Sequence, residues 1–455
     1  MALTLHFRSA PWGLATNLLF WAALLGFLTC SDRALAGLLC FCPLWATYFL
    51  TFRFSRPVIE RWDYVFNSDT ARYLQEAMAF LTTPRHLGFP VITFPLALLD
   101  ELGSRYLGIP RLGREYLYLQ CALVGCLAVK LLCKVLAADI PSKRLRILTA
   151  CGFACSLATW AFSSVIETFM LSALLFLATL HHLRAYSESG TLSSFAPIPG
   201  LALVALCVSI ENIYLVALFV LTIAWRAALY RRAPAWSHLI ICAGMLAAGI
   251  LSMLWIAERG MGPGCYAGGS GQQVGGSAED IIDHLHRFTS DYRPRTPLTS
   301  VGLHAGLMYR VFVMSVRAQL NTRPQNYTRK PRGQLRPTAE DLIYYGSFLT
   351  LVVMAGRGLW LVAGGGDQQR RLLVALLAVT LVLRHAFMFL FATQQCILFS
   401  LPSILCMWML VATGTSRLVS GRSKAVRLLV GACFWAIVVL LVLTNLAYLL
   451  QIQIQ

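Results

Sequence analysis

Residues 428–450 read LLVGACFWAIVVLLVLTNLAYLL, an uninterrupted apolar run without a charged side chain. A helix of about 20 apolar residues crosses the hydrocarbon core of a bilayer, so this stretch predicts a membrane-spanning helix. Working outward from it, we find similar runs at 12–30, 36–52, 116–138, 147–162, 165–183, 197–210, 212–226, 237–257, 341–363, 372–391 and 395–413. A shorter run at 88–102 contains Pro90 and Pro95 and is better interpreted as an interfacial or re-entrant segment.

The overall composition agrees with this interpretation. The chain has 455 residues, of which 58% are hydrophobic and only 13% are charged, and its mean hydropathy is +0.66. Soluble domains are about half apolar and about one quarter charged, which argues against a soluble enzyme and against a disordered chain. We therefore expect an all-α integral membrane protein: one polytopic domain over residues 1–455 with about 10–13 transmembrane helices and external loops that bear short helices.

Basic residues orient these helices. Lys and Arg total 38 against 20 Asp and Glu, a formal net charge of +18, and most Arg residues lie beside apolar runs. This placement favours a topological signal over nucleic-acid binding, and we expect no nucleic-acid partner. Four clusters fall on one side if the runs between them are out-and-back pairs, and that side should be the cytoplasm. The clusters are Lys143/Arg144/Arg146, Arg226/Arg231/Arg232, Arg370/Arg371 and Arg417/Arg422/Lys424/Arg427.

The opposite, non-cytoplasmic face then receives the remaining connections. These are a first external loop over 53–115, a long basic loop over 258–340, and tight turns near Ser163–Glu167, Glu211–Asn212 and Gln394–Gln395. Within the long loop, residues 302–320 have apolar side chains at helical spacing, which is typical of an amphipathic helix on a membrane surface. We expect any active site on this face.

Two further features leave alternatives open. Residues 1–36 could be a signal peptide that ends near Ala34-Leu35-Ala36, but a second apolar run begins at once and favours an uncleaved first helix. The 14 Cys residues are scattered without a CxxC pair, so we interpret them as small buried apolar residues.

The segment richest in candidate chemistry is 61–90, RWDYVFNSDTARYLQEAMAFLTTPRHLGFP, in the first external loop. Apolar residues after Asp69 keep helical spacing, so Asp69 falls at or near a helix N-terminus. Asp is a favoured N-cap, and capping is the structural alternative to a functional role.

This segment resembles the first external loop of the GT-C superfamily of membrane glycosyltransferases. NSDTARYLQEAMAFL followed by RHLGFPV is most similar to the protein O-mannosyltransferase-like branch, in which an acidic residue after an early span is the catalytic carboxylate. The resemblance implies a GT-C-like fold with Asp69 as catalytic base. It also implies that Arg72, Arg85 and His86 contribute to substrate binding.

Two later segments resemble the same branch. SSVIETFMLSALLFLATL, residues 163–180, is similar to the start of a helix that carries an acidic residue, here Glu167. RHAFMFLFATQQCILFSLPSILCMWML, residues 384–410, resembles the late helix pair beside the lipid-donor site. Arg384 and His385 lie inside an apolar run, where ionisable residues usually have a function. The resemblance implies that Glu167, Arg384 and His385 contribute to substrate binding. Glu167 could instead only cap a helix, and Arg384 and His385 could instead lie at an interface.

The resemblance implies a transferase that moves a hexose or pentose from a polyprenyl-phosphate donor to an acceptor hydroxyl of a protein, lipid or glycan, with inversion. Asp69 would take the hydroxyl proton and arginines would stabilise the phosphate leaving group. No cofactor is required, although a divalent cation could assist, and residues 279–286, EDIIDHLH, could bind one.

We expect a multi-pass protein of the bacterial plasma membrane rather than the endoplasmic reticulum. A transporter or flippase of a lipid-linked or anionic substrate, or a noncatalytic scaffold, is the alternative.

Overall fold

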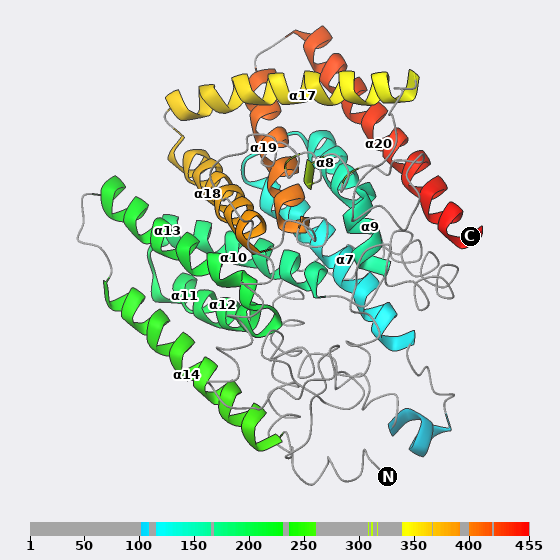
Figure 1. Cartoon of the computed structure of the whole chain (residues 1–455). Helices are drawn as coiled ribbons and strands as arrows, with labels where there is room; N and C mark the ends of the chain where they lie inside the picture. Colours follow the sequence, from blue (N-terminus) through cyan, green and yellow to red (C-terminus); the bar gives the residue numbers. More distant parts are fainter. Residues whose placement is uncertain are drawn as a thin grey trace.

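The computed structural model describes residues 102–108, 115–164, 168–230, 236–260, 308, 311–312, 316, 339–365, 367–391, 400–420 and 423–454. This described part is built of helices and contains no β-strand (Figure 1). After a short helix over 102–107, the elements are α7 (Glu115–Ala137), α8 (Lys143–Cys155), α9 (Leu157–Ser164), α10 (Phe169–Ser189), α11 (Leu192–Phe195), α12 (Pro197–Val208), η1 (Ile210–Ile213), α13 (Tyr214–Tyr230), α14 (Trp236–Gly260), α17 (Ala339–Gly364), α18 (Gln368–Phe391), α19 (Leu401–Val419) and α20 (Lys424–Ile454).

Length and apolar composition identify the membrane-spanning helices. Within the described residues, seven helices are long and apolar enough to cross a membrane, or up to eight if the bent pair of α8 and α9 is one span. Two shorter apolar stretches, Leu192–Val208 and Trp236–Gly249, accompany them. The chain is therefore a multi-pass, all-α membrane protein. The expected total of about 10–13 helices includes runs at 12–30 and 36–52, which lie outside the described residues, as does the short run at 88–102 except for Leu102.

The helix ends that carry basic residues come together at one end of the bundle. The Arg226 guanidinium, late in α13, donates to the carbonyls of Tyr186 (3.2 Å) and Ser187 (2.9 Å) at the end of α10. Ser187 in turn bonds Gln369 at the start of α18 (Oγ–Oε1 2.9 Å). Arg371 Nε donates to the carbonyl of Val362 (3.3 Å), near the end of α17. These contacts bring two of the four basic clusters, at Arg226 and at Arg370/Arg371, to one end of the bundle. The common side of all four clusters and its cytoplasmic location stay predictions.

One expected span is bent. Residues 147–162 belong to α8 and α9, which meet at Ser156 at an angle of 63°. Ser156 is extended (φ −61°, ψ 139°), and the next amide, Leu157 N–H, donates to the carbonyl of Val316 (2.9 Å) instead of to its own helix. The bend therefore has a specific cause: an acceptor from a distant segment replaces the helical one.

Asn445 of α20 closes this bend from the other side. Its Nδ2 donates to the carbonyls of Cys155 (2.7 Å) and Val316 (3.1 Å). Non-helical backbone at membrane depth is tolerated only where protein or water satisfies its polar groups. At this bend, hydrogen bonds from other parts of the protein satisfy the backbone groups, and they join α8, α9, α20 and the segment at Val316. We call this arrangement the joint at Ser156.

The segment expected as a surface helix over 302–320 differs from that expectation at two described residues. Val311 and Val316 are buried in the hydrophobic core, with 1% and 0% exposure. The carbonyl of Val316 is needed at the bend, which requires the segment to enter the bundle there. The rest of residues 302–320, apart from Met308 and Phe312, lies outside the described residues.

Glycines allow close packing around α19. A Cβ on Gly358 of α17 would collide with the backbone of Gly414, and one on Gly414 would collide with the backbone of Ala355. Small residues of this kind let helix backbones approach closely in membranes. The fully buried Trp408 packs over Gly152 of α8, whose Cβ would lie 2.6 Å from the indole ring. Trp408 Nε1 also donates to Ser156 Oγ (3.1 Å), so α19 contributes to the bend as well.

Candidate functional site

A buried ion pair lies between η1 and α18. Arg384 Nη1 is 3.4 Å from Glu211 Oε2, and the two side chains are only 2% and 4% exposed. Arg384 belongs to the candidate span Gln368–Met388, and Glu211 begins the candidate span Glu211–Leu229. Taking such charges out of water is costly unless they are paired, so the pair explains how both residues are tolerated there.

Two aromatic rings surround the arginine. The guanidinium carbon of Arg384 lies 5.6 Å from the centroid of the Tyr214 ring and 5.4 Å from that of Phe387. Cation–π contacts of this length are attractive, and more so away from water. Arg384 is therefore held on one side by a carboxylate and on others by aromatic faces.

The local fold of η1 positions Glu211. Ser209 is extended (φ −158°, ψ 130°), which ends α12 and starts the single turn of η1. Asn212 Nδ2 then donates to the carbonyl of Ala205 (2.8 Å) and to Ser172 Oγ of α10 (3.0 Å). The Ala205 carbonyl also accepts from the Ser209 amide (3.0 Å), so Asn212 adds a second donor there and ties η1 to α10. This anchoring fixes the residue next to the ion pair.

Buried hydroxyl groups gather at helix ends. Among the buried hydroxyls of the described residues that have no hydrogen-bond partner, four lie at helix ends: Ser163, Thr168, Ser209 and Ser403. They lie at the end of α9, before α10, before η1 and in the first turn of α19. Buried polar groups normally find partners, so these hydroxyls are available for groups beyond the described residues. The first two flank residues 165–167, which the structure does not describe.

Most of the residues singled out from the sequence belong to segments outside the described part of the chain. Asp69, Arg72, Arg85, His86 and Glu167 lie outside the described residues, so their roles stay predictions. The whole first external loop, except for residues 102–108 and Glu115, and most of the loop over 258–340 do so as well.

Arg384 and His385 are described, and both lie inside a long apolar helix as expected. Arg384 joins Glu211 and Tyr214, whereas His385 is half-buried on an adjacent face of α18. Successive helical residues point about 100° apart, so the two do not share one face.

Sequence reasoning missed Glu211 and Tyr214 as members of a site. The turn at Glu211–Asn212 was expected on the non-cytoplasmic face, but only as a connection. A carboxylate at the edge of an apolar run is itself a signal, because ionisable residues within membrane segments usually pair with one another. Glu211 could therefore have been proposed as a partner for Arg384.

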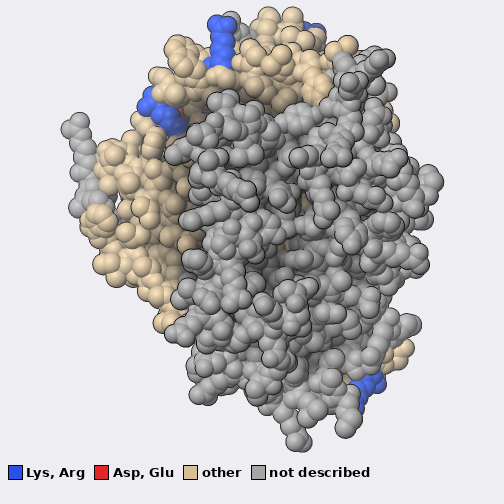
Figure 2. Space-filling model, viewed as in Figure 1, with Lys and Arg blue, Asp and Glu red and all other residues tan. Residues whose placement is uncertain are grey.

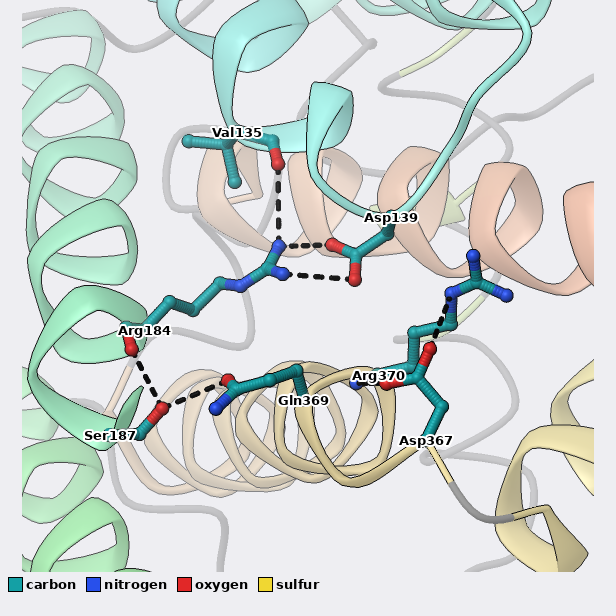
Figure 3. A network of polar contacts seen from close by, with 7 residues as sticks. All are labelled: Val135, Asp139, Arg184, Ser187, Asp367, Gln369 and Arg370. Atoms are coloured by element: carbon teal, nitrogen blue, oxygen red, sulfur yellow. Dashed lines mark hydrogen bonds and ion pairs between the residues drawn. The ribbon is translucent and has the colours of Figure 1, made fainter. Parts of the chain in front are cut away.

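A second polar network occupies the basic end of the bundle (Figure 3). The guanidinium of Arg184, in α10, forms a two-pronged ion pair with Asp139, which lies between α7 and α8. One prong joins Nη1 to Oδ2, and the other joins Nη2 to Oδ1 at 3.0 Å. Arg184 Nη1 also donates to the carbonyl of Val135 (3.4 Å). Burial raises the pKa of the Asp139 carboxyl above its usual range, and the neighbouring Arg184 opposes that shift.

This second network ties three helices together. Ser187 Oγ donates to the carbonyl of Arg184 (2.7 Å) and bonds Gln369 of α18, so α7, α10 and α18 meet there. Asp367 and Arg370, at the start of α18, form a partly exposed ion pair (3.1 Å). The contacts are all internal, which indicates a structural role for this end.

Metal ligation finds no support among the residues that the structure describes, which contain no group of three or more His, Cys, Asp or Glu side chains that could hold an ion. Residues 279–286 lie outside them, so a divalent cation at that segment stays a prediction.

Comparisons with protein-family models, with curated proteins and with solved structures find no match to this chain. The class that fold and composition define is that of a multi-pass, all-α membrane protein.

Proposed function

We propose that this protein is a membrane glycosyltransferase that moves a sugar from a polyprenyl-phosphate donor to an acceptor hydroxyl on the non-cytoplasmic face. The resemblance of residues 61–90, 163–180 and 384–410 to the GT-C superfamily supports the proposal. The observation that carries it furthest is the buried pair of Arg384 and Glu211, 3.4 Å apart. A prenyl-linked donor reaches the enzyme from within the bilayer. The Arg384 guanidinium is a positive charge inside a candidate membrane-spanning helix, Gln368–Met388.

The proposed reaction is a single displacement. The acceptor oxygen attacks the anomeric carbon of the sugar while the bond from that carbon to the phosphate oxygen breaks. The polyprenyl phosphate leaves with the bonding electrons, and Asp69 takes the proton of the acceptor hydroxyl. Arginine is suited to the leaving phosphate because its planar guanidinium matches the phosphate oxygens. Arg384 is the described candidate for that role, alongside Arg72 and Arg85.

In this proposal Glu211 is a positioning residue. It holds the guanidinium of Arg384 from one side while the rings of Tyr214 and Phe387 contact it from others. Preorganised charges stabilise a developing anion without rearrangement at the moment of reaction. A fixed Arg384 would therefore act on the departing phosphate more effectively than a mobile surface arginine.

The test is transfer from polyprenyl-phosphate hexoses and pentoses by the purified full chain. Asp69→Asn should lower the transfer rate by about 100-fold or more, because general-base catalysis typically contributes that much. Asp63→Asn, in the same segment, is the matched control and should keep activity. Donor binding should persist in Asp69→Asn. Full transfer by Asp69→Asn would refute the catalytic role of this residue, and no transfer from any donor by the wild-type chain would refute the enzyme proposal.

One observation favours the second candidate, a transporter or flippase. Broken helices at membrane depth are common in transporters, and α8 and α9 break at Ser156. In transporters, however, the backbone groups at such a break contact the substrate. Here Asn445 and Leu157 already bond the carbonyls of Cys155 and Val316. Movement of a fluorescent lipid-linked sugar across proteoliposomes, unaffected by Asp69→Asn, would favour the transporter.

A further inference from the structure

Four basic side chains lie at the beginnings of two helices. Lys143 and Arg144 start α8, and Lys424 and Arg427 lie in the first turn of α20. All four residues are exposed. We call them the α8–α20 basic cluster. In Figure 2, blue Lys and Arg side chains appear at the upper edge of the molecule, where Figure 1 shows the connections of α17 to α18 and of α19 to α20.

The beginning of α8 lies beside α20, two turns after that helix begins. The guanidinium of Arg144 reaches α20, where its Nη2 lies 3.8 Å from the position that a Cβ on Gly431 would take. Arg427 lies four residues before Gly431, and residues four apart share one helix face. Arg144 therefore lies along the face of α20 that also carries Arg427, so like charges are brought together from two helices.

No described carboxylate neutralises this cluster. Of the acidic residues described at this end, Asp139 pairs with Arg184, Asp367 pairs with Arg370, and the exposed Glu188 forms no ion pair with a described member of the cluster. Among the residues that the structure describes, none forms an ion pair with Lys143, Arg144, Lys424 or Arg427. Cations on one face without a counter-charge repel each other, and an anion beside Arg144 and Arg427 would relieve that repulsion.

The cluster lies directly beside apolar surface. Exposed apolar side chains follow within one to three turns of each helix beginning: Ile147 (47% exposed) on α8, and Leu428 (55%), Leu429 (52%) and Trp435 (50%) on α20. A partner that fits this surface must combine an anionic group with hydrocarbon in the same order along the helix axis. A phospholipid with an anionic headgroup has that arrangement, whereas a free phosphate offers only the charge.

We propose that the α8–α20 basic cluster binds the headgroup of an anionic phospholipid, with its acyl chains against the exposed apolar residues of α8 and α20. The lipid belongs to the leaflet at the basic end of the bundle, which the positive-inside rule assigns to the cytoplasmic side. This binding is independent of the proposed transferase activity. The site would anchor the beginning of α20 against α8 at the membrane boundary.

The experiment measures binding of soluble short-chain lipids to the purified full chain in neutral detergent by microscale thermophoresis. Dioctanoyl phosphatidylglycerol is the anionic probe, and dioctanoyl phosphatidylcholine is the zwitterionic one. We expect the anionic lipid to bind at least about tenfold more tightly. The double variant Arg144→Gln/Arg427→Gln should weaken its binding by about 30-fold, since each basic side chain near an anionic surface contributes about fivefold.

Two control variants define the role of charge at this place. Arg144→Lys/Arg427→Lys keeps both charges and should retain most of the affinity. Arg105→Gln removes an exposed arginine from the helix over 102–107, outside the cluster, and should change nothing. Equal affinity for both lipids would overturn the proposal, as would an equal loss in Arg105→Gln. Inorganic phosphate that competes with the lipid at similar concentration would also overturn it, because the site would then recognise the anion alone.

Discussion

The guanidinium of Arg384 lies 3.4 Å from the carboxylate of Glu211, although 173 residues separate the two positions along the chain. One residue lies late in α18 and the other in the turn before α13, so the ion pair joins two candidate membrane-spanning helices. Of its two members, Arg384 is one of the site residues that the sequence predicts.

Removing one member of this pair should be more harmful than removing both. Glu211→Ala leaves Arg384 buried without its carboxylate, and breaking a buried pair in this way typically costs about 3–5 kcal/mol. Glu211→Leu combined with Arg384→Met replaces both charges by apolar groups and should recover most of that loss. Chemical unfolding in mixed micelles measures both. If the double variant is no more stable than Glu211→Ala, the unpaired charge of Arg384 is not the cause of the loss.

Asn445 provides a second test, at the bend between α8 and α9. Asn445→Leu removes the side-chain donor to the carbonyls of Cys155 and Val316. Val316 keeps the Leu157 amide, so the main loss is at the Cys155 carbonyl, and leaving a buried acceptor unsatisfied costs about 1–3 kcal/mol. Thr444→Val is the matched control, because Thr444 bonds only the Leu440 carbonyl of its own helix. We expect faster hydrogen–deuterium exchange at residues 155–157 in Asn445→Leu and unchanged exchange in Thr444→Val. Equal exchange in both would show that Asn445 does not hold the bend.

Glycine substitutions should separate the crossing of α17 and α19 from the rest of α17. Gly414→Ala places a Cβ against the backbone of Ala355, so we expect a loss of at least about 1–3 kcal/mol through overpacking. Gly356→Ala, one residue from Ala355, meets nothing within 4 Å and should be neutral or slightly stabilising. Thermal unfolding of the two variants compares them directly. Similar melting temperatures would argue against close contact of the two backbones.

The acid dependence of stability should report on Asp139. Its pKa is raised in the folded protein by burial, so the folded chain binds this proton more tightly than the unfolded chain. The contribution of this group to the free energy of unfolding is therefore greatest below about pH 4, the usual range of the carboxyl, and falls as the pH rises through its raised pKa. Asp139→Asn should remove this slope. A wild-type slope of opposite sign would mean that pairing with Arg184 outweighs burial.

Several helices could be predicted from hydropathy, because a membrane span needs only sufficient apolar length. The run at 116–138 corresponds to α7, Glu115–Ala137, and the run at 341–363 corresponds to α17, Ala339–Gly364. The bend at Ser156 could not be predicted. The Leu157 amide donates to the carbonyl of Val316, and the sequence around residue 157 does not indicate which distant residue accepts this bond.

The site shows the same division. Arg384 was predicted from its chemistry, because a charged residue in an apolar run is unusual wherever it lies. Its partner was not, since the packing of α13 against α18 decides which carboxylate it meets. Asp69 and Glu167 were singled out by resemblance, and they remain predictions because they lie outside the described residues.

The joint at Ser156 has a consequence for how the protein is made. The ribosome delivers α8 and α9 to the translocon long before it has synthesised Val316 and Asn445, which supply and satisfy the backbone bonds of that joint. The early helices therefore cannot reach their final arrangement before Val316 and Asn445 have been synthesised. This step of assembly waits for α20, and truncating the chain before Asn445 should leave the early helices inserted but open to quality-control proteases.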